Sequence, residues 1–301
     1  MNAPSVPPSP ALQTAPEVAR PAELELWSNR RLVHPLSRTL AARLASTWVT
    51  PNMVSVAGAA MAAVGAAAYT LLPRPWGALL GLLSHYAWHV LDGADGDLAR
   101  RTGRSSPSGE LVDGICDYAG RTVLYVALGA DGAAQFGGWV WLLAGVTGVS
   151  RIVQANFYET VRRQYRRWVY GTAWIRQTLA AGPPGGRGPA GALGRLFLAV
   201  STRVTPDSTV LDVAMEHAAA AGSTSRQAAR AACQAELAPV VRRAAILSTN
   251  AETVAVFLSM LAGGPIFLFV YVAVVLNAAY AGLYAGQRRR LARTATRLTP
   301  G

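Results

Sequence analysis

The sequence predicts an all-α protein that crosses a membrane six times and carries a further helix on the membrane surface. Two observations support this fold class. Hydrophobic residues make up 51% of the 301 residues, charged residues only 15%, and the mean hydropathy is positive, unlike an ordinary soluble domain. Several stretches also lack charge over lengths that approach the roughly 20 residues of a bilayer-spanning helix.

The uncharged stretches give the spanning helices in order. The first four are expected over residues 53–73, 76–91, 109–130 and 132–152. Residues 253–287 then run for 35 residues without a charge, which is too long for one span. The Gly-Gly-Pro sequence at 263–265 should divide this run into a fifth and a sixth helix, because proline removes a backbone donor and glycine weakens a helix.

The arginines predict the orientation in the membrane. All 28 basic residues are arginine, against 16 acidic residues, which gives a net charge of +12. They gather before the first helix, after the second, after the fourth and in the C-terminal tail, whereas the opposite loops contain only Arg74. By the positive-inside rule, both termini and the loop after the second helix face the cytoplasm, here that of a bacterial plasma membrane. Charge spread over so many loops does not favour nucleic-acid binding.

The remaining segments complete the expected domain organisation. Residues 23–48 mix leucine and tryptophan with arginine at helical spacing, which predicts an amphipathic juxtamembrane helix. Residues 156–243 are polar, contain a Gly/Pro-rich hinge and are expected to form a cytoplasmic insertion. The other segments are a disordered tail at 1–22, helices one to four at 49–155, helices five and six at 244–287, and a basic tail at 288–301.

Six of the 16 acidic residues lie between residues 91 and 121. On a helix, Asp92 and Asp95 share one face with Gly96 and Ala99, and on the next helix Asp113 and Asp117 share a face with Gly109. The short segment between the two helices is long enough to reverse the chain. Four carboxylates are therefore expected to meet at a helix–helix interface, at the cytoplasmic edge of the membrane.

Clustered carboxylates repel one another unless a positive charge compensates them. Mg²⁺ and Mn²⁺ prefer hard oxygen ligands, and two such ions about 4 Å apart form a clamp for phosphoryl chemistry. Small residues on the shared faces leave room for a ligand, and Arg100 could bind a phosphate. A carboxylate that is not fully engaged could accept a proton from a hydroxyl group.

The pattern D-x2-D-G-x2-A-R-x8-G-x3-D-x3-D resembles the signature of the CDP-alcohol phosphotransferase family of integral membrane enzymes. Eight residues carry the resemblance: Asp92, Asp95, Gly96, Ala99, Arg100, Gly109, Asp113 and Asp117. The Thr-Pro-Asn sequence at 50–52 is also similar to the family. The resemblance covers residues 30–155 and 244–290, and leaves the long insertion between helices four and five unexplained.

The resemblance implies that a CDP-linked alcohol donates its phosphoalcohol to an acceptor hydroxyl, with release of CMP. Asp92, Asp95 and Asp113 would bind Mg²⁺ or Mn²⁺, as two ions. Asp117 would act as the general base and also touch a metal. The residues expected at the CDP pocket are Gly96, Ala99, Arg100, Gly109, Pro51 and Asn52, with Thr50 beside them.

The substrates are expected to be lipid-linked. CDP-diacylglycerol is the favoured donor because its tails could remain in the bilayer, with a small alcohol or phosphorylated polyol as acceptor. The alternative is a soluble CDP-alcohol that donates to a lipid hydroxyl. The resemblance implies basic residues for a phosphorylated acceptor, and Arg121 and Arg151 are the candidates. Arg121 is expected inside the bundle, where an arginine needs an anionic partner. The resemblance also implies a homodimer.

Two other interpretations compete with the transferase. Intramembrane aspartates are found in cation transporters, but the glycine, alanine and arginine between these acids have no evident purpose there. His85 and His89 precede Asp92 on the same helix face and raise a zinc or iron site as an alternative. We expect them instead to be polar residues lining the bundle, because a metal site needs a full ligand set.

Overall fold

The structure is a computed structural model that describes residues 21–172 and 202–298. These residues are helical and include no strand, which confirms the all-α fold class for this part of the chain. Most of the predicted N-terminal tail and the hinge of the insertion lie outside the described residues.

Three consecutive helices carry the acidic stretch and its surroundings, and the first of them packs against the other two. α2 (Pro51–Leu71) begins where the Thr50 hydroxyl accepts the amide of Met53, at 3.3 Å. α3 (Trp76–Arg101) carries the second apolar run and the first acids on one unbroken helix. α4 (Pro107–Phe136) begins at Ser106, whose hydroxyl accepts the amide of Gly109 at 3.1 Å. Such caps satisfy backbone donors that have no partner within a helix.

The second half of the bundle consists of α5 and the C-terminal helices. α5 (Val140–Tyr170) ends at Gly171, which has a left-handed φ of 72°. α10 (Thr249–Ala262) ends at Gly263 and Gly264, with φ of 139° and 149°. The chain therefore turns where the Gly-Gly-Pro sequence predicts. It continues as α11 (Ile266–Val270), a π-helical segment (Tyr271–Leu276) and α12 (Asn277–Leu298).

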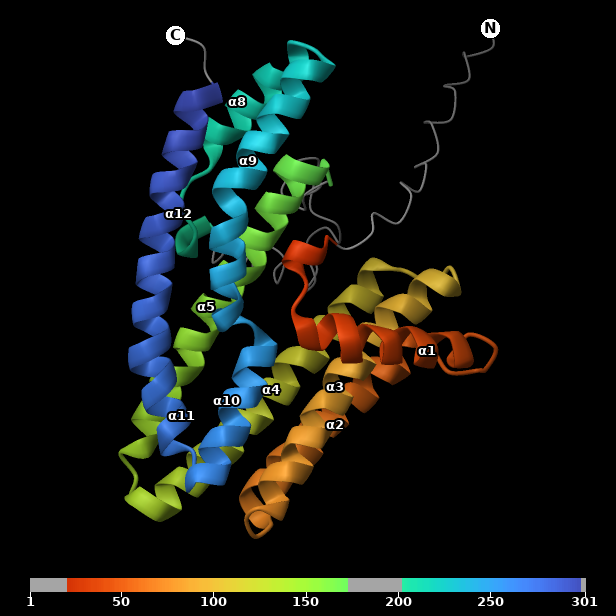
Figure 1. The fold of residues 1–301 in the computed structure, drawn as a ribbon. Coiled ribbons are helices and arrows are strands. Elements are labelled where there is room, and N and C mark those ends of the chain that lie inside the picture. The colour runs from red at the N-terminus through yellow and green to blue at the C-terminus, as the bar shows by residue number, and fades with distance from the viewer. Residues whose placement is uncertain (1–20, 173–201, 299–301) are drawn as a thin grey trace, which may run out of the picture.

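The described part of the insertion extends the bundle instead of forming a separate lobe. α8 (Thr209–Ala220) and α9 (Ser223–Ala244) pack on α5 and α12 (Figure 1). A short 3₁₀ segment (Ala245–Leu247) joins α9 to α10. α5 continues past residue 155 without a break, because its buried face persists through Phe157, Val161 and Tyr165. The domain boundaries proposed from the sequence remain predictions.

The N-terminal segment lies across the α2–α3 hairpin (Figure 1). It comprises a 3₁₀ turn (Ala22–Leu24), a π-helical stretch (Asn29–Val33) and α1 (His34–Leu44). Ala41 of α1 is buried against Ala94 and Leu98 of α3. A helix thus exists within the predicted juxtamembrane range, and its place on the membrane surface remains a prediction.

Three described stretches are long and apolar enough to cross a membrane by length and composition: Pro51–Leu71, Ser223–Ala262 and Ile266–Leu298. α3, α4 and α5 are not among these stretches. Large apolar side chains nevertheless stay exposed on them, for example Leu83 at 65% and Leu142 at 76%. Apolar surface of this kind suits contact with lipid.

Candidate active site

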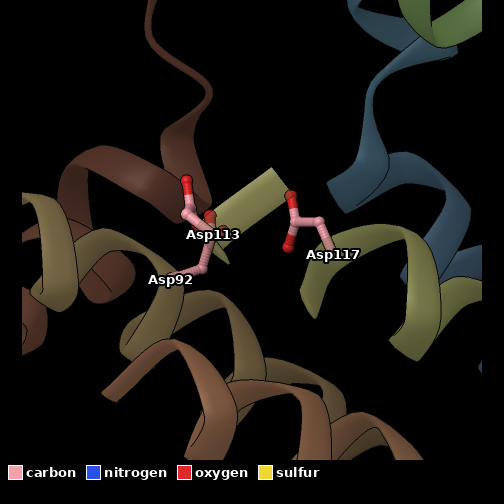
Figure 2. A group of neighbouring side chains, drawn as sticks. All are labelled: Asp92, Asp113 and Asp117. Atoms are coloured by element: carbon pink, nitrogen blue, oxygen red, sulfur yellow. The ribbon is translucent and has the colours of Figure 1, made fainter. Parts of the chain in front are cut away.

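Three of the four predicted carboxylates form one cluster. Asp92 projects from α3, and Asp113 and Asp117 project from α4 one turn apart (Figure 2). One carboxylate oxygen from each residue lies within 4.8 Å of the other two. The i, i+4 spacing places the two acids of α4 on one face of that helix. The structure therefore brings Asp92, Asp113 and Asp117 together.

Asp95 lies one turn further along α3 and is not a member of this three-carboxylate group. Its side chain is 5% exposed and accepts a hydrogen bond from the Ser55 hydroxyl of α2 at 2.6 Å. It also accepts the backbone amide of Gly96. Asp95 and Asp113 nevertheless line one pocket, so the fourth predicted carboxylate borders the same space.

The donor set of the cluster fits a hard divalent cation. Oxygen-only ligands at this spacing suit Mg²⁺ or Mn²⁺, and close carboxylates repel one another without a compensating charge. Two arginines close in sequence to the signature acids bind other carboxylates: Arg100 pairs with Asp97, and Arg121 pairs with Glu252. The chemistry of these residues therefore supports cation binding.

A pocket of about 270 Å³ opens beside the cluster, between the ends of α2, α3 and α4. Its wall includes all six residues that the sequence suggested for the CDP pocket: Pro51, Asn52, Gly96, Ala99, Arg100 and Gly109. Arg104, Ser105 and Ser106 from the α3–α4 turn also line it. The turn thus adds one arginine side chain and two serine hydroxyl groups to the pocket wall. The role of these residues in nucleotide binding remains a prediction.

Arg121 and Arg151 meet on one carboxylate, Glu252 of α10. Arg151 is 3% exposed and lies 2.9 Å from Glu252, and it also donates to the carbonyls of Leu247 and Ser248. Arg121 lies 3.4 Å from the same carboxylate. The Tyr125 hydroxyl donates to the other Glu252 oxygen at 2.6 Å. These contacts fix the start of α10 against α4 and α5.

The Arg121 side chain differs from that of Arg151 in being 27% exposed. It donates to the Thr249 hydroxyl at 2.9 Å. Its guanidinium carbon also lies 5.6 Å from the centre of the Trp88 ring, in cation–π range. Arg121 therefore lies at the edge of the buried network, one helical turn beyond Asp117.

The two histidines do not join the carboxylate cluster. His89 is buried and shares a 2.8 Å hydrogen bond with Thr253 of α10. His85 is 1% exposed, and its ring nitrogens have no hydrogen-bond partner among the described residues. Among the described residues, the side chains grouped closely enough to hold a metal ion are the three aspartates, without either histidine. The positions of His85 and His89 therefore agree with the expectation that both are polar residues lining the bundle.

Sequence reasoning missed Ser55, Glu252 and the residues of the α3–α4 turn. Ser55 lies one helical turn after the Thr-Pro-Asn sequence. This spacing could have placed its hydroxyl on the α2 face that meets Asp95 of α3. The Ser-Pro pair at 106–107 is a helix-start signal, which could have placed the turn at the pocket. Nothing near Arg151 in the sequence points to Glu252, 101 residues away.

The fold and site are those of a helical domain whose acidic cluster opens to a polar pocket at the helix ends. Residues 48–181 match the family model described as CDP-alcohol phosphatidyltransferase. This match spans the aspartate pattern and confirms its resemblance to that family.

The similar curated proteins are cholinephosphotransferases. Cholinephosphotransferase 1 of Gallus gallus is 33% identical over 97 residues, or 30% of this chain and 28% of that protein. Choline/ethanolaminephosphotransferase 2 of Arabidopsis thaliana is 30% identical over 109 residues, 33% of this chain and 28% of that protein. Human Cholinephosphotransferase 1 is 34% identical over 97 residues, 30% of this chain and 23% of that protein. The chain therefore aligns with about a quarter of the length of these relatives.

Proposed function

We propose that this protein is an integral membrane enzyme of phospholipid biosynthesis that transfers a phosphoalcohol from a CDP-linked donor to an acceptor hydroxyl and releases CMP. One observation carries the proposal: the carboxylate cluster adjoins a pocket lined by the other residues of the signature. The family match over residues 48–181 supports it. The six spans, the cytoplasmic orientation of the site and a homodimer belong to the same proposal.

In this proposal Asp92, Asp113 and Asp117 hold one divalent cation, and Asp95 with Asp113 holds a second beside the pocket. Bound Mg²⁺ or Mn²⁺ would neutralise the charge that develops on the transferred phosphoryl group. Arg100 and Arg104 would hold the diphosphate by charge-assisted hydrogen bonds. The small side chains of Gly96, Ala99 and Gly109, with Pro51 and Asn52, would leave room for the nucleotide.

Asp117 is the proposed general base. The acceptor hydroxyl gives its proton to the Asp117 carboxylate while its oxygen bonds to the phosphorus that carries the alcohol. The bond from that phosphorus to the bridging oxygen breaks, and CMP leaves with both electrons of that bond. Arg121, one turn beyond Asp117 and partly exposed, would face the acceptor. Arg151, enclosed with Glu252, would act by holding the start of α10.

The names of the relatives refer to phosphotransfer of choline or ethanolamine. On this basis we place first a soluble CDP-alcohol as donor, with a lipid hydroxyl as acceptor. CDP-diacylglycerol, with a small alcohol or phosphorylated polyol as acceptor, remains the second candidate. The description of the matching family model, which refers to phosphatidyl transfer, favours it.

A donor experiment separates the two. Purified protein with Mg²⁺ or Mn²⁺ is given either CDP-choline with diacylglycerol, or CDP-diacylglycerol with a panel of alcohols, and CMP and lipid products are measured. We expect CMP and a new phospholipid from the first pair. Product from the CDP-diacylglycerol arm alone would reverse the donor assignment. If neither arm releases CMP, other CDP-alcohols are tested with diacylglycerol, and absence of CMP release there as well would contradict the proposed function.

A further inference from the structure

α1 packs against the back of the α3 turn that carries the signature acids. The Ser37 side chain is 1% exposed and donates a hydrogen bond to the Val90 carbonyl at 2.8 Å. At about 100° per residue, Val90, Ala94 and Leu98 lie on one side of α3. By the same spacing, Asp92 and Ala99 lie on the opposite side, and Asp95 lies between the two sides. The helix that closes the back of this turn is therefore α1.

Gly93 sets how closely the two helices approach. A Cβ atom at this position would lie 2.7 Å from the Ser37 Oγ and 3.2 Å from its Cβ, and these are its only neighbours within 4 Å among the described residues. A methyl group at residue 93 would therefore displace the Ser37 hydroxyl from its bond to Val90, and Ser37 would have to move by a few tenths of an ångström relative to α3. Asp92 belongs to α3 whereas Asp113 and Asp117 belong to α4. A shift of the α3 turn would therefore change their separation from Asp92.

The α3 turn is held from a second direction as well. Ser55 of α2 bonds Asp95 at 2.6 Å, and Val54 of α2 joins Ala41 of α1 in the same buried apolar cluster. Ser37 and Ser55 therefore fix the turn from two helices, while its acidic face is open to α4. Residues that orient metal ligands in this way typically affect metal affinity by roughly 10–100-fold.

We propose that Ser37 is a positioning residue for the carboxylate cluster, acting through its contact with Val90 and Gly93 to set the distance of Asp92 from Asp113 and Asp117. The inference rests on the proposed function in one respect, that Asp92 binds a divalent cation. It assigns to α1 a part in the geometry of the site, in addition to its expected place on the membrane surface.

The test measures equilibrium Mn²⁺ binding by electron paramagnetic resonance in the full-length purified protein, without substrate. We expect Ser37→Ala to weaken binding about threefold or more, and Gly93→Ala to weaken it about tenfold or more, scaled from such orienting contacts. Gly93→Ala combined with Ser37→Gly should bind more tightly than Gly93→Ala alone, because both atoms that the new methyl group meets belong to Ser37.

Matched controls separate positioning from general damage. Thr39→Ala removes an exposed α1 hydroxyl that bonds only the Pro35 carbonyl of its own helix, and Gly148→Ala adds a methyl group with no neighbour within 4 Å. Both should bind Mn²⁺ like the wild type. Thermal unfolding is recorded for every variant, and Ser37→Ala keeps the test valid if Gly93→Ala does not fold.

Wild-type Mn²⁺ affinity in both Ser37→Ala and Gly93→Ala would overturn the positioning role. So would a double variant that binds no better than Gly93→Ala. A wild-type protein that binds no Mn²⁺ would overturn the metal site itself, which is a separate and recognisable failure.

Discussion

Replacing Glu252 with glutamine tests the buried network at the start of α10. The Glu252 and Arg151 side chains are 6% and 3% exposed, and Arg121 shares the same carboxylate. Removing one partner of a buried ion pair costs about 3–5 kcal/mol, because the remaining charge is left without compensation. The glutamine oxygen can still accept one hydrogen bond, worth about 1 kcal/mol. We therefore expect a loss of about 2–4 kcal/mol in the free energy of unfolding.

Glu159→Gln is the matched control, because Glu159 also binds two arginines, Arg162 at 3.1 Å and Arg163 at 2.8 Å. Its side chain is 37% exposed, and exposed pairs contribute about 0–1 kcal/mol. In detergent, the unfolding temperature should fall by about 5–15 °C for Glu252→Gln and by less than about 4 °C for Glu159→Gln. Equal shifts in the two variants would refute the reasoning that burial decides the cost.

Two further predictions concern the site and the N-terminal segment. Ser55→Ala removes the 2.6 Å hydrogen bond to Asp95. It should lower kcat/KM for CMP release about tenfold while the unfolding temperature stays within a few degrees, and unchanged kinetics would contradict this. Burial alone would raise the pKa of the Glu23 carboxyl, but hydrogen bonds from Tyr170 and Tyr165 hold that pKa below its ordinary value of 4.5. The attachment of this segment to α5 should therefore be complete above about pH 4.5 and weaken as the pH falls further. Hydrogen exchange of the segment, corrected for intrinsic rates, should show this loss, and Glu23→Gln should show weakened attachment at every pH.

Local spacing was sufficient to predict the acidic face of the site. The i, i+3 and i, i+4 intervals that place Asp92 beside Asp95 and Asp113 beside Asp117 are properties of a helix, and a short connection dictates that two such helices lie antiparallel. The same reasoning placed the break at Gly263–Pro265. These features depend on residues that are close in sequence.

Contacts between distant residues were not accessible in this way. The Ser37 hydroxyl meets the Val90 carbonyl across 53 positions, and a serine in a helix gives no sign of which backbone it faces. Arg121 was recognised as a cation inside the bundle that needs an anion, but its partner Glu252 belongs to a helix whose place depends on the whole bundle. The continuation of α5 to Tyr170 was missed because its sequence is rich in arginine, although one face of the helix stays buried.

The most direct test of the central claim is CMP release by the wild type and Asp117→Asn under a Mn²⁺ or Mg²⁺ titration, with a CDP-linked donor and its acceptor. Loss of a general base typically costs about 10²–10⁴-fold in rate. We predict cation-dependent CMP release by the wild type, and a loss of at least that order in the variant, with both proteins unfolding at similar temperatures. Release that continues at the wild-type rate in Asp117→Asn, or without any divalent cation, would contradict the account.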